Sequence, residues 1–117
     1  MKDRILKLLW DVREACNAIE QFVQGKTDSD YLKDNLLRSA VERQLMILGE
    51  ALYQANRIDQ DLSKHITDLR KIIGFRHLLV HDYSSTQNET VWGIVENNVP
   101  QLGEEVARLL PDEDPTE

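Results

Sequence analysis

The sequence contains one cysteine, three prolines and five glycines among its 117 residues. A single cysteine, Cys16, cannot form an internal disulfide, so cysteine usage gives no sign of an oxidising compartment. Cys16 falls in an apolar stripe, where we expect it to be buried. Proline and glycine interrupt helices more than other residues do, and their scarcity leaves room for long helical segments. With 41% apolar and 30% charged residues, the composition is that of a globular protein and not of a disordered one.

The chain also lacks a long apolar run. No segment approaches the ~20 consecutive apolar residues that a membrane-spanning helix needs. The N-terminal stretch "ILKLLW" is too short and too charged to be the apolar core of a secretory signal peptide. We therefore expect a cytoplasmic protein with no membrane partner.

Positive charge is in deficit, because 21 acidic residues stand against 14 basic ones and the formal net charge is −7. A protein that coats nucleic acid non-specifically needs a surplus of lysine and arginine to neutralise phosphates. The composition argues against that class. It does not exclude a small positive pocket that binds a few phosphates.

Apolar residues recur at three- and four-residue steps in four segments, at about residues 3–24, 30–55, 65–83 and 91–109. This period is typical of amphipathic helices. Short connections between such helices predict an all-α fold, an up-and-down bundle of four to five helices. Pro100 lies inside the last segment and predicts a kink or a split near residues 97–99.

We expect one helical domain over residues 1–110, followed by an acidic C-terminal tail over residues 111–117. The second predicted helix is apolar over a wide arc, so we expect it to contact several neighbours and to contribute to a homodimer. Gly49 lies inside this helix, where glycine costs about 1 kcal/mol relative to alanine. Close approach of another helix would compensate for that cost.

The stretch "FRHLLVHDY" at residues 75–83 gathers several groups that carry chemistry. On a helix, Arg76 and Tyr83 share one face, whereas His77 and His81 share another. Arg76 and His81 are then about 140° apart around the axis. Their heads converge more easily if a second copy of the same helix lies opposite, so this geometry favours a site formed by a dimer.

Three interpretations of this stretch remain open from the residues alone. His77 and His81 have the four-residue spacing of metal ligands and Asp82 is adjacent, but Asp82 points about 100° away and a third ligand would have to come from elsewhere. In a second interpretation, His81 transfers a proton in phosphoryl chemistry, Arg76 stabilises phosphate charge and Tyr83 contacts the substrate. In the third, Arg76 pairs with an acidic neighbour and the histidines are structural.

The run "RHLLVHDY" resembles the RX4HXY signature of the HepT-like branch of the HEPN superfamily, with Arg76, His81 and Tyr83 at the three motif positions. "LGEAL" at residues 48–52 resembles the "IGEA" segment of that family. "VWGIVENNVPQL" at residues 91–102 resembles its C-terminal pattern. The similarity follows the family in order over nearly the whole chain.

The resemblance implies an all-α homodimer in which two motif helices face each other and form a composite cleft. It implies a metal-independent endoribonuclease without a cofactor, which acts on RNA as the toxin of a type VII toxin–antitoxin pair. The antitoxin of such pairs is a minimal nucleotidyltransferase that transfers AMP from ATP to the motif tyrosine. Carried to this sequence, the acceptor of AMP would be Tyr83.

These expectations assign Arg76 and His81 as catalytic residues, with His77, Asp82 and Tyr83 supporting them or positioning the substrate. Many relatives have asparagine directly after the motif arginine, where this chain has His77, so the division of roles between the two imidazoles stays open. No metal site is part of this assignment.

Glu50, in "LGEAL", lies within a largely apolar helix and should face solvent or have a partner, either Arg76 or Arg43. Glu50 has a structural role, or it orients the side chain of Arg76 without contacting the substrate. Two alternatives to the ribonuclease also stay open. One is a non-catalytic HEPN module that binds a nucleotide or a partner nucleotidyltransferase, and the other is a purely structural helical dimer.

Overall fold

The computed structural model describes residues 2–81 and 85–111, and every regular element within them is a helix. In chain order these are α1 (Lys2–Val23), α2 (Asp28–Lys33), α3 (Asn35–Ile58), the 3₁₀ helix η1 (Gln60–Lys64), α4 (Leu69–His81), α5 (Ser85–Asn97) and α6 (Val99–Leu109). The all-α prediction is confirmed. The described residues form six α-helices instead of four to five, because two predicted segments are each divided.

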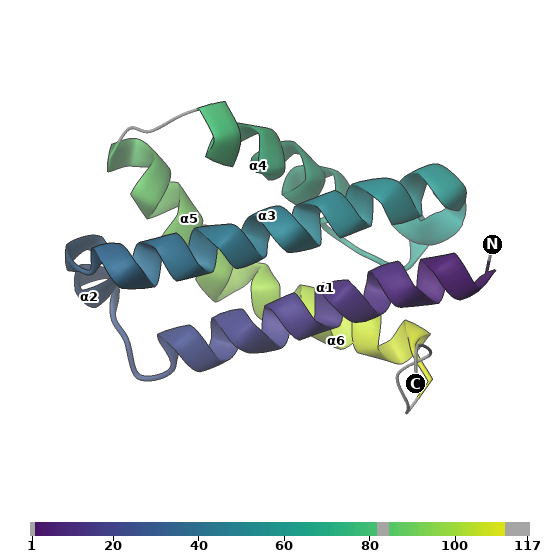
Figure 1. Ribbon diagram of the computed structural model, residues 1–117, viewed down its shortest axis with the longest axis horizontal. Coiled ribbons are helices and arrows are strands. Elements are labelled where there is room, and N and C mark those ends of the chain that lie inside the picture. The colour runs from purple at the N-terminus through teal and green to yellow at the C-terminus, as the bar shows by residue number, and fades with distance from the viewer. Residues whose placement is uncertain (1, 82–84, 112–117) are drawn as a thin grey trace.

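The two longest helices, α1 and α3, lie side by side and run in opposite directions along the long axis of the molecule (Figure 1). The helix α6 packs against α1, and α4 packs against α3, while α5 connects these two outer helices. The helix α3 therefore has α1 on one side and α4 on another, which agrees with its wide apolar arc. No helix in residues 2–81 or 85–111 is both long and apolar enough to cross a lipid bilayer.

The core forms where the apolar stripes of these helices meet. Burial of such side chains provides the main driving force for folding, roughly 1.5–3 kcal/mol for each fully buried Val, Leu or Ile. Cys16 is buried, as expected, and burial together with the nearby charge of Glu20 raises the pKa of its thiol to about 12. The fully buried positions of α1 and α3 include Val12, Cys16, Ile19, Val41, Leu48 and Leu52.

The second predicted helix is interrupted at Asp34, whose extended backbone ends α2 and begins α3. The Asp34 carboxylate accepts a hydrogen bond from the Leu37 amide (3.1 Å) and so caps α3. A capping box begins α2, in which Thr27 and Asp30 each accept a hydrogen bond from the other's backbone amide. Local capping chemistry therefore divides a segment whose apolar period is continuous.

The helix α4 begins at Leu69, later than the predicted start near residue 65, because η1 and a turn precede it. The turn is held by Glu105 of α6, which accepts hydrogen bonds from the backbone amide and hydroxyl of Thr67. The split predicted near residues 97–99 is confirmed, since α5 ends at Asn97 and α6 begins at Val99. Pro100 lies in the first turn of α6, where a missing amide hydrogen costs nothing.

The helices α3 and α4 approach each other closely at Gly49. A Cβ added at Gly49 would lie 3.0 Å from the Cβ of Arg76 and 3.7 Å from the carbonyl oxygen of Ile72. The expected close helix approach is therefore present. The side chain at position 76 can lie against the α3 backbone because position 49 has none.

We expect Gly49→Ala and Gly74→Ala to have different effects on stability. Gly74 lies within α4 and no described atom lies within 4 Å of an added Cβ, so alanine should raise the free energy of unfolding by about 0.5–1 kcal/mol. At Gly49 the same helical gain is offset by the contact with Arg76, and the free energy of unfolding should stay level or fall. Urea unfolding monitored by circular dichroism measures both. An equal increase in the free energy of unfolding for both variants would contradict the close approach of α3 and α4 at Gly49.

Candidate active site around Arg76

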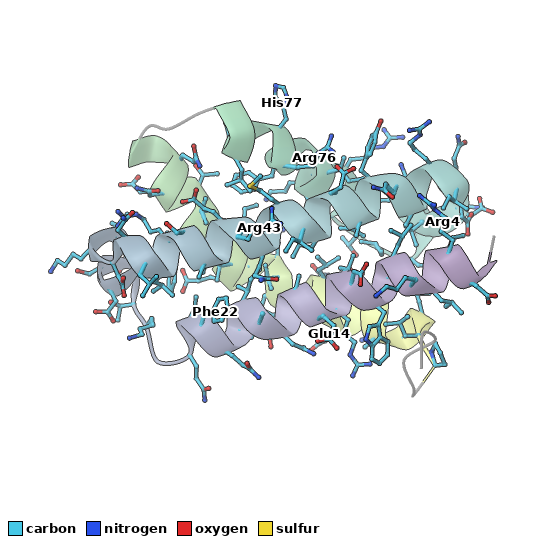
Figure 2. All side chains as sticks on the ribbon, in the orientation of Figure 1. Arg4, Glu14, Phe22, Arg43, Arg76 and His77 are labelled. Atoms are coloured by element: carbon cyan, nitrogen blue, oxygen red, sulfur yellow. The ribbon has the colours of Figure 1, made fainter. Side chains whose placement is uncertain are left out.

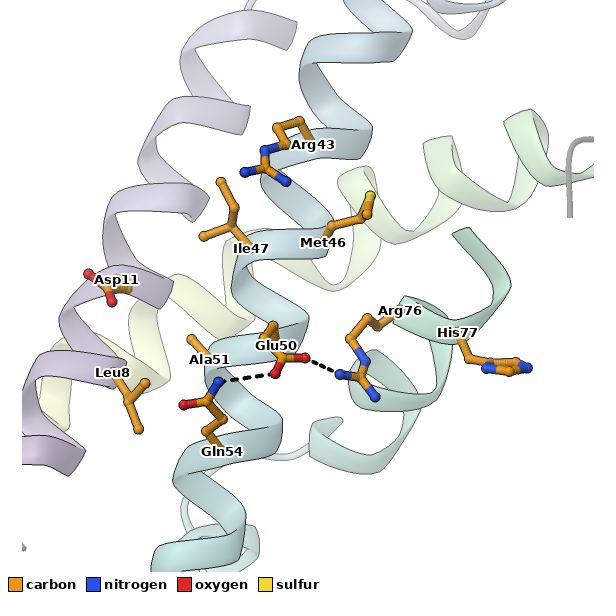
Figure 3. A pocket seen from close by; sticks show the side chains of 10 residues that line it. All are labelled: Leu8, Asp11, Arg43, Met46, Ile47, Glu50, Ala51, Gln54, Arg76 and His77. Atoms are coloured by element: carbon orange, nitrogen blue, oxygen red, sulfur yellow. Dashed lines mark hydrogen bonds and ion pairs between the residues drawn. The ribbon is translucent and has the colours of Figure 1, made fainter. Parts of the chain in front are cut away.

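Arg76 projects from α4 towards α3, where its guanidinium forms an ion pair with Glu50 (Figure 3). The side chain of Arg76 is 31% exposed and that of Glu50 is 47% exposed. The pair is therefore formed at the edge of the helix contact, where solvent and a ligand can still reach the guanidinium. Of the two partners that the sequence allowed for Glu50, the structure has Arg76 and not Arg43.

The aromatic ring of Tyr53 forms a second support for the same guanidinium. The Cζ atom of Arg76 lies 4.7 Å from the centroid of the Tyr53 ring, within the range of a cation–π contact. Tyr53 lies one turn after Gly49 on α3, so both residues face α4. Three features of α3 thus fix the position of Arg76. They are the backbone at Gly49, which has no side chain, the carboxylate of Glu50 and the ring of Tyr53.

Glu50 is itself held by a neighbour on its own helix. The side-chain amide of Gln54 donates a hydrogen bond to Glu50 (3.0 Å), and the amide oxygen of Gln54 accepts one from Arg4 of α1 (3.1 Å). The hydrogen bond from Gln54, together with the hydrogen bond and charge of Arg76, lowers the pKa of Glu50 below its usual value despite some loss of solvation. Glu50 is therefore an anion at neutral pH, which keeps Arg76 in place.

A pocket of about 670 Å³ extends along the outer face of α3 between α1 and α4 (Figure 3). Its size lies within the range of small-molecule binding sites. The Arg76–Glu50 pair lies in its wall. Both apolar and polar or charged side chains line it, and they comprise Leu8, Asp11, Arg43, Met46, Ile47, Glu50, Ala51, Gln54, Arg76 and His77.

Of the residues assigned from the motif, the structure describes the side chains of Arg76 and His77. His77 belongs to the same pocket lining, but its ring extends outward from α4, away from α3 (Figures 2 and 3). His81 is the last residue of α4, and its side chain lies outside the described residues, as do Asp82 and Tyr83. The convergence of Arg76 with His81 therefore stays a prediction.

Sequence reasoning overlooked Tyr53 and Gln54. A signal was present, because both follow Gly49 and Glu50 at a spacing of four residues and so share their helix face. That signal becomes specific only once α4 is known to dock on this face. Within residues 2–81 and 85–111, no group of three or more His, Cys, Asp or Glu side chains could hold a metal ion.

We expect the pKa of Glu50 to depend on Gln54. Titration followed by NMR should give a pKa below the usual value for glutamate in the unchanged chain, and Gln54→Ala should raise this pKa. Because this pKa is lowered by folding, its contribution to stability is present above the unfolded pKa and is lost as pH falls through the folded value. The pKa of Asp30 in α2, lowered by the hydrogen bond from the Thr27 amide, is the internal control and should not move. If the pKa of Glu50 stays the same in Gln54→Ala, the hydrogen bond from Gln54 does not stabilise the Glu50 carboxylate.

Comparison with known proteins shows the family to which the chain belongs. The family model "Ribonuclease HepT-like" matches residues 12–109, from the first half of α1 to the end of α6. A protein of Thermococcus cleftensis named "Probable ribonuclease HepT" is 30% identical over 96 residues, which cover 80% of this chain and 84% of that protein. A Methanocaldococcus jannaschii protein named "Putative RNase" is 27% identical over 107 residues, covering 90% and 95% of the two chains. No solved structure matches significantly.

The span matched by the family model contains Glu50, Tyr53 and Arg76. The chain belongs to the ribonuclease HepT-like family of the HEPN superfamily.

Proposed function

We propose that the chain is a metal-independent endoribonuclease in which Arg76 and His81 carry out the cleavage. The observation that supports this most directly is the fixed guanidinium of Arg76, which lies in a pocket wall and is held from behind by Glu50 and Tyr53. A cation held in this way needs little reorganisation when charge develops on a substrate. The relatives named as ribonucleases indicate that this substrate is RNA.

Arg76 would bind the phosphate of the linkage to be cleaved. A guanidinium carries more N–H donors than one carboxylate can use, so the ion pair with Glu50 leaves donors for non-bridging phosphate oxygens. These oxygens gain negative charge in the transition state, and Arg76 stabilises that charge. Glu50 orients the guanidinium and does not contact the substrate in this proposal.

His81 would move the protons. As a general base it takes the proton of the ribose 2′-hydroxyl, whose oxygen attacks the phosphorus, and as a general acid it protonates the departing 5′-oxygen. Neither step needs a metal ion. His77 and Asp82 support these groups, with the division of labour between the two imidazoles left open.

Two copies of the chain would complete the site. Because Arg76 and His81 lie about 140° apart on one helix, a symmetric dimer with facing α4 helices brings the arginine of one copy near the histidine of its partner. The pocket beside α4 and the half-exposed outer face of α3 are compatible with such an arrangement.

We further propose that the enzyme is a toxin controlled by a minimal nucleotidyltransferase that transfers AMP to Tyr83. Tyr83 lies seven residues after Arg76 in the sequence, a spacing of about two turns in a regular helix. A phosphodiester at this position would add negative charge and bulk beside Arg76 and would compete with the phosphate of RNA. This regulation follows from the motif tyrosine and from the family resemblance.

We expect His81→Ala and Arg76→Ala each to reduce RNA cleavage by about 10²- to 10⁴-fold, since each removes one group that acts in the transition state. His65→Ala serves as the matched control, because His65 is exposed at the end of η1 and lies outside the motif. Addition of a chelator should leave the rate unchanged. A purified, folded His81→Ala protein that cleaves at the original rate would refute the assignment.

Mixing the two inactive proteins tests the shared site. Refolding Arg76→Ala together with His81→Ala produces mixed dimers, each with one unaltered arginine opposite one unaltered histidine. We expect cleavage to recover, up to about a quarter of the original rate for random pairing in a two-fold dimer. If the mixture stays as inactive as its components, both groups act within a single copy or the dimer does not exist.

A further inference from the structure

The half-buried Tyr53 and the exposed Arg57 form a pair on α3 beside Arg76. The Cζ atom of Arg57 lies 5.8 Å from the centroid of the Tyr53 ring, whose centroid also lies 4.7 Å from Cζ of Arg76. One half-buried ring therefore has two guanidinium groups within cation–π distance. The steps assigned above to Arg76 and His81 give no role to Arg57.

Tyr31, the other tyrosine whose side chain the structure describes, has a different environment from Tyr53. Tyr31 is fully buried and packs against Trp92 with ring centroids 5.3 Å apart, as an aromatic core residue does. Tyr53, in contrast, is only half-buried, and its ring contacts charged groups. Its environment is that of a binding surface and not that of a core.

The chemistry of this pair suits single-stranded RNA. Proteins that bind single strands combine aromatic rings, on which bases stack, with cations that follow the phosphates. Arg57 is exposed, and a guanidinium–ring contact at such a site is weaker than stacking of a nucleobase. Arg57 can therefore turn to a phosphate while a base takes its place on the ring.

We propose that Tyr53 and Arg57 bind the nucleotide next to the cleaved linkage, with its base stacked on Tyr53 and its phosphate bound by Arg57. This inference rests on the proposed ribonuclease function and extends it. Arg76 would hold the phosphate that reacts, and the row from Arg76 over Tyr53 to Arg57 would set the path of the strand along α3. Sequence tolerance follows, because every base has a face that can stack.

Binding of two uncleavable strands separates a stacking ring from one that only supports Arg76. The first probe is a mixed-sequence 2′-O-methyl RNA, which lacks the attacking hydroxyl, and the second is an abasic strand of equal length with the same phosphates. For Tyr53→Leu we expect about tenfold weaker binding of the base-containing strand, from the loss of one stacked base. The abasic strand should lose clearly less affinity, because only the support that the ring gives to Arg76 is removed for it. Tyr53→Phe keeps the ring and should bind both strands as the unchanged chain does.

Arg57→Ala should weaken the binding of both strands, since it removes a phosphate contact. Arg108→Ala removes the same charge from an exposed position on α6. It is the matched control and should change the binding of neither strand. Circular dichroism of each variant verifies that it is folded. In cleavage assays Tyr53→Leu should raise KM more than it lowers kcat.

Several outcomes would overturn this inference. If Tyr53→Leu weakens the binding of the two strands equally, the ring acts only by holding Arg76. If Tyr53→Leu changes the binding of neither strand, or if the unchanged chain binds neither strand, the nucleotide site does not exist. Failure of the unchanged chain to cleave any RNA would refute the ribonuclease proposal itself. An unchanged chain that cleaves RNA, together with a Tyr53→Leu variant that binds both strands normally, would refute the nucleotide site alone.

Discussion

The close contact between α3 and α4 at Gly49 is the constraint on which the site depends. Because position 49 has no side chain, Arg76 lies against the backbone of α3, with the Cβ position of residue 49 only 3.0 Å away. At that depth its guanidinium meets both the carboxylate of Glu50 and the ring of Tyr53. A wider helix spacing would leave Arg76 as a long, freely rotating surface cation, and the catalytic role proposed for Arg76 depends on its fixed position.

This arrangement also explains how an acidic chain could bind RNA. With a net charge of −7, the protein has little long-range attraction for phosphates. The relevant cations are instead gathered locally, where Arg76 and Arg57 share one aromatic ring. Glu50 lowers the local charge but fixes the arginine beside it. Affinity would then come from geometry and stacking more than from bulk charge.

Several features of the fold could be predicted from the sequence because they follow from local patterns. Apolar periodicity located the main helices, Pro100 located the break between α5 and α6, and Gly49 indicated a close helix contact. The break at Asp34 was missed, because the apolar period runs through it and only the extended backbone of the cap reveals the interruption.

The site was less accessible to sequence reasoning. Glu50 could have paired with Arg43 or with Arg76, and only the rotation with which α4 docks on α3 decides between them. Tyr53 escaped notice because a tyrosine in an amphipathic helix usually belongs to the core, as Tyr31 does. The motif residues His81, Asp82 and Tyr83 keep the roles that the family resemblance implies, as predictions.

The most direct test of the central claim is a double-mutant cycle between Glu50 and Arg76, with single-turnover RNA cleavage as its readout. If Glu50 acts by holding the forked guanidinium, Glu50→Gln should slow cleavage in the unchanged chain and have almost no further effect after Arg76→Lys. If Glu50→Gln instead slows both proteins by the same factor while both stay folded, Glu50 does not act through Arg76 and this account of the site is wrong.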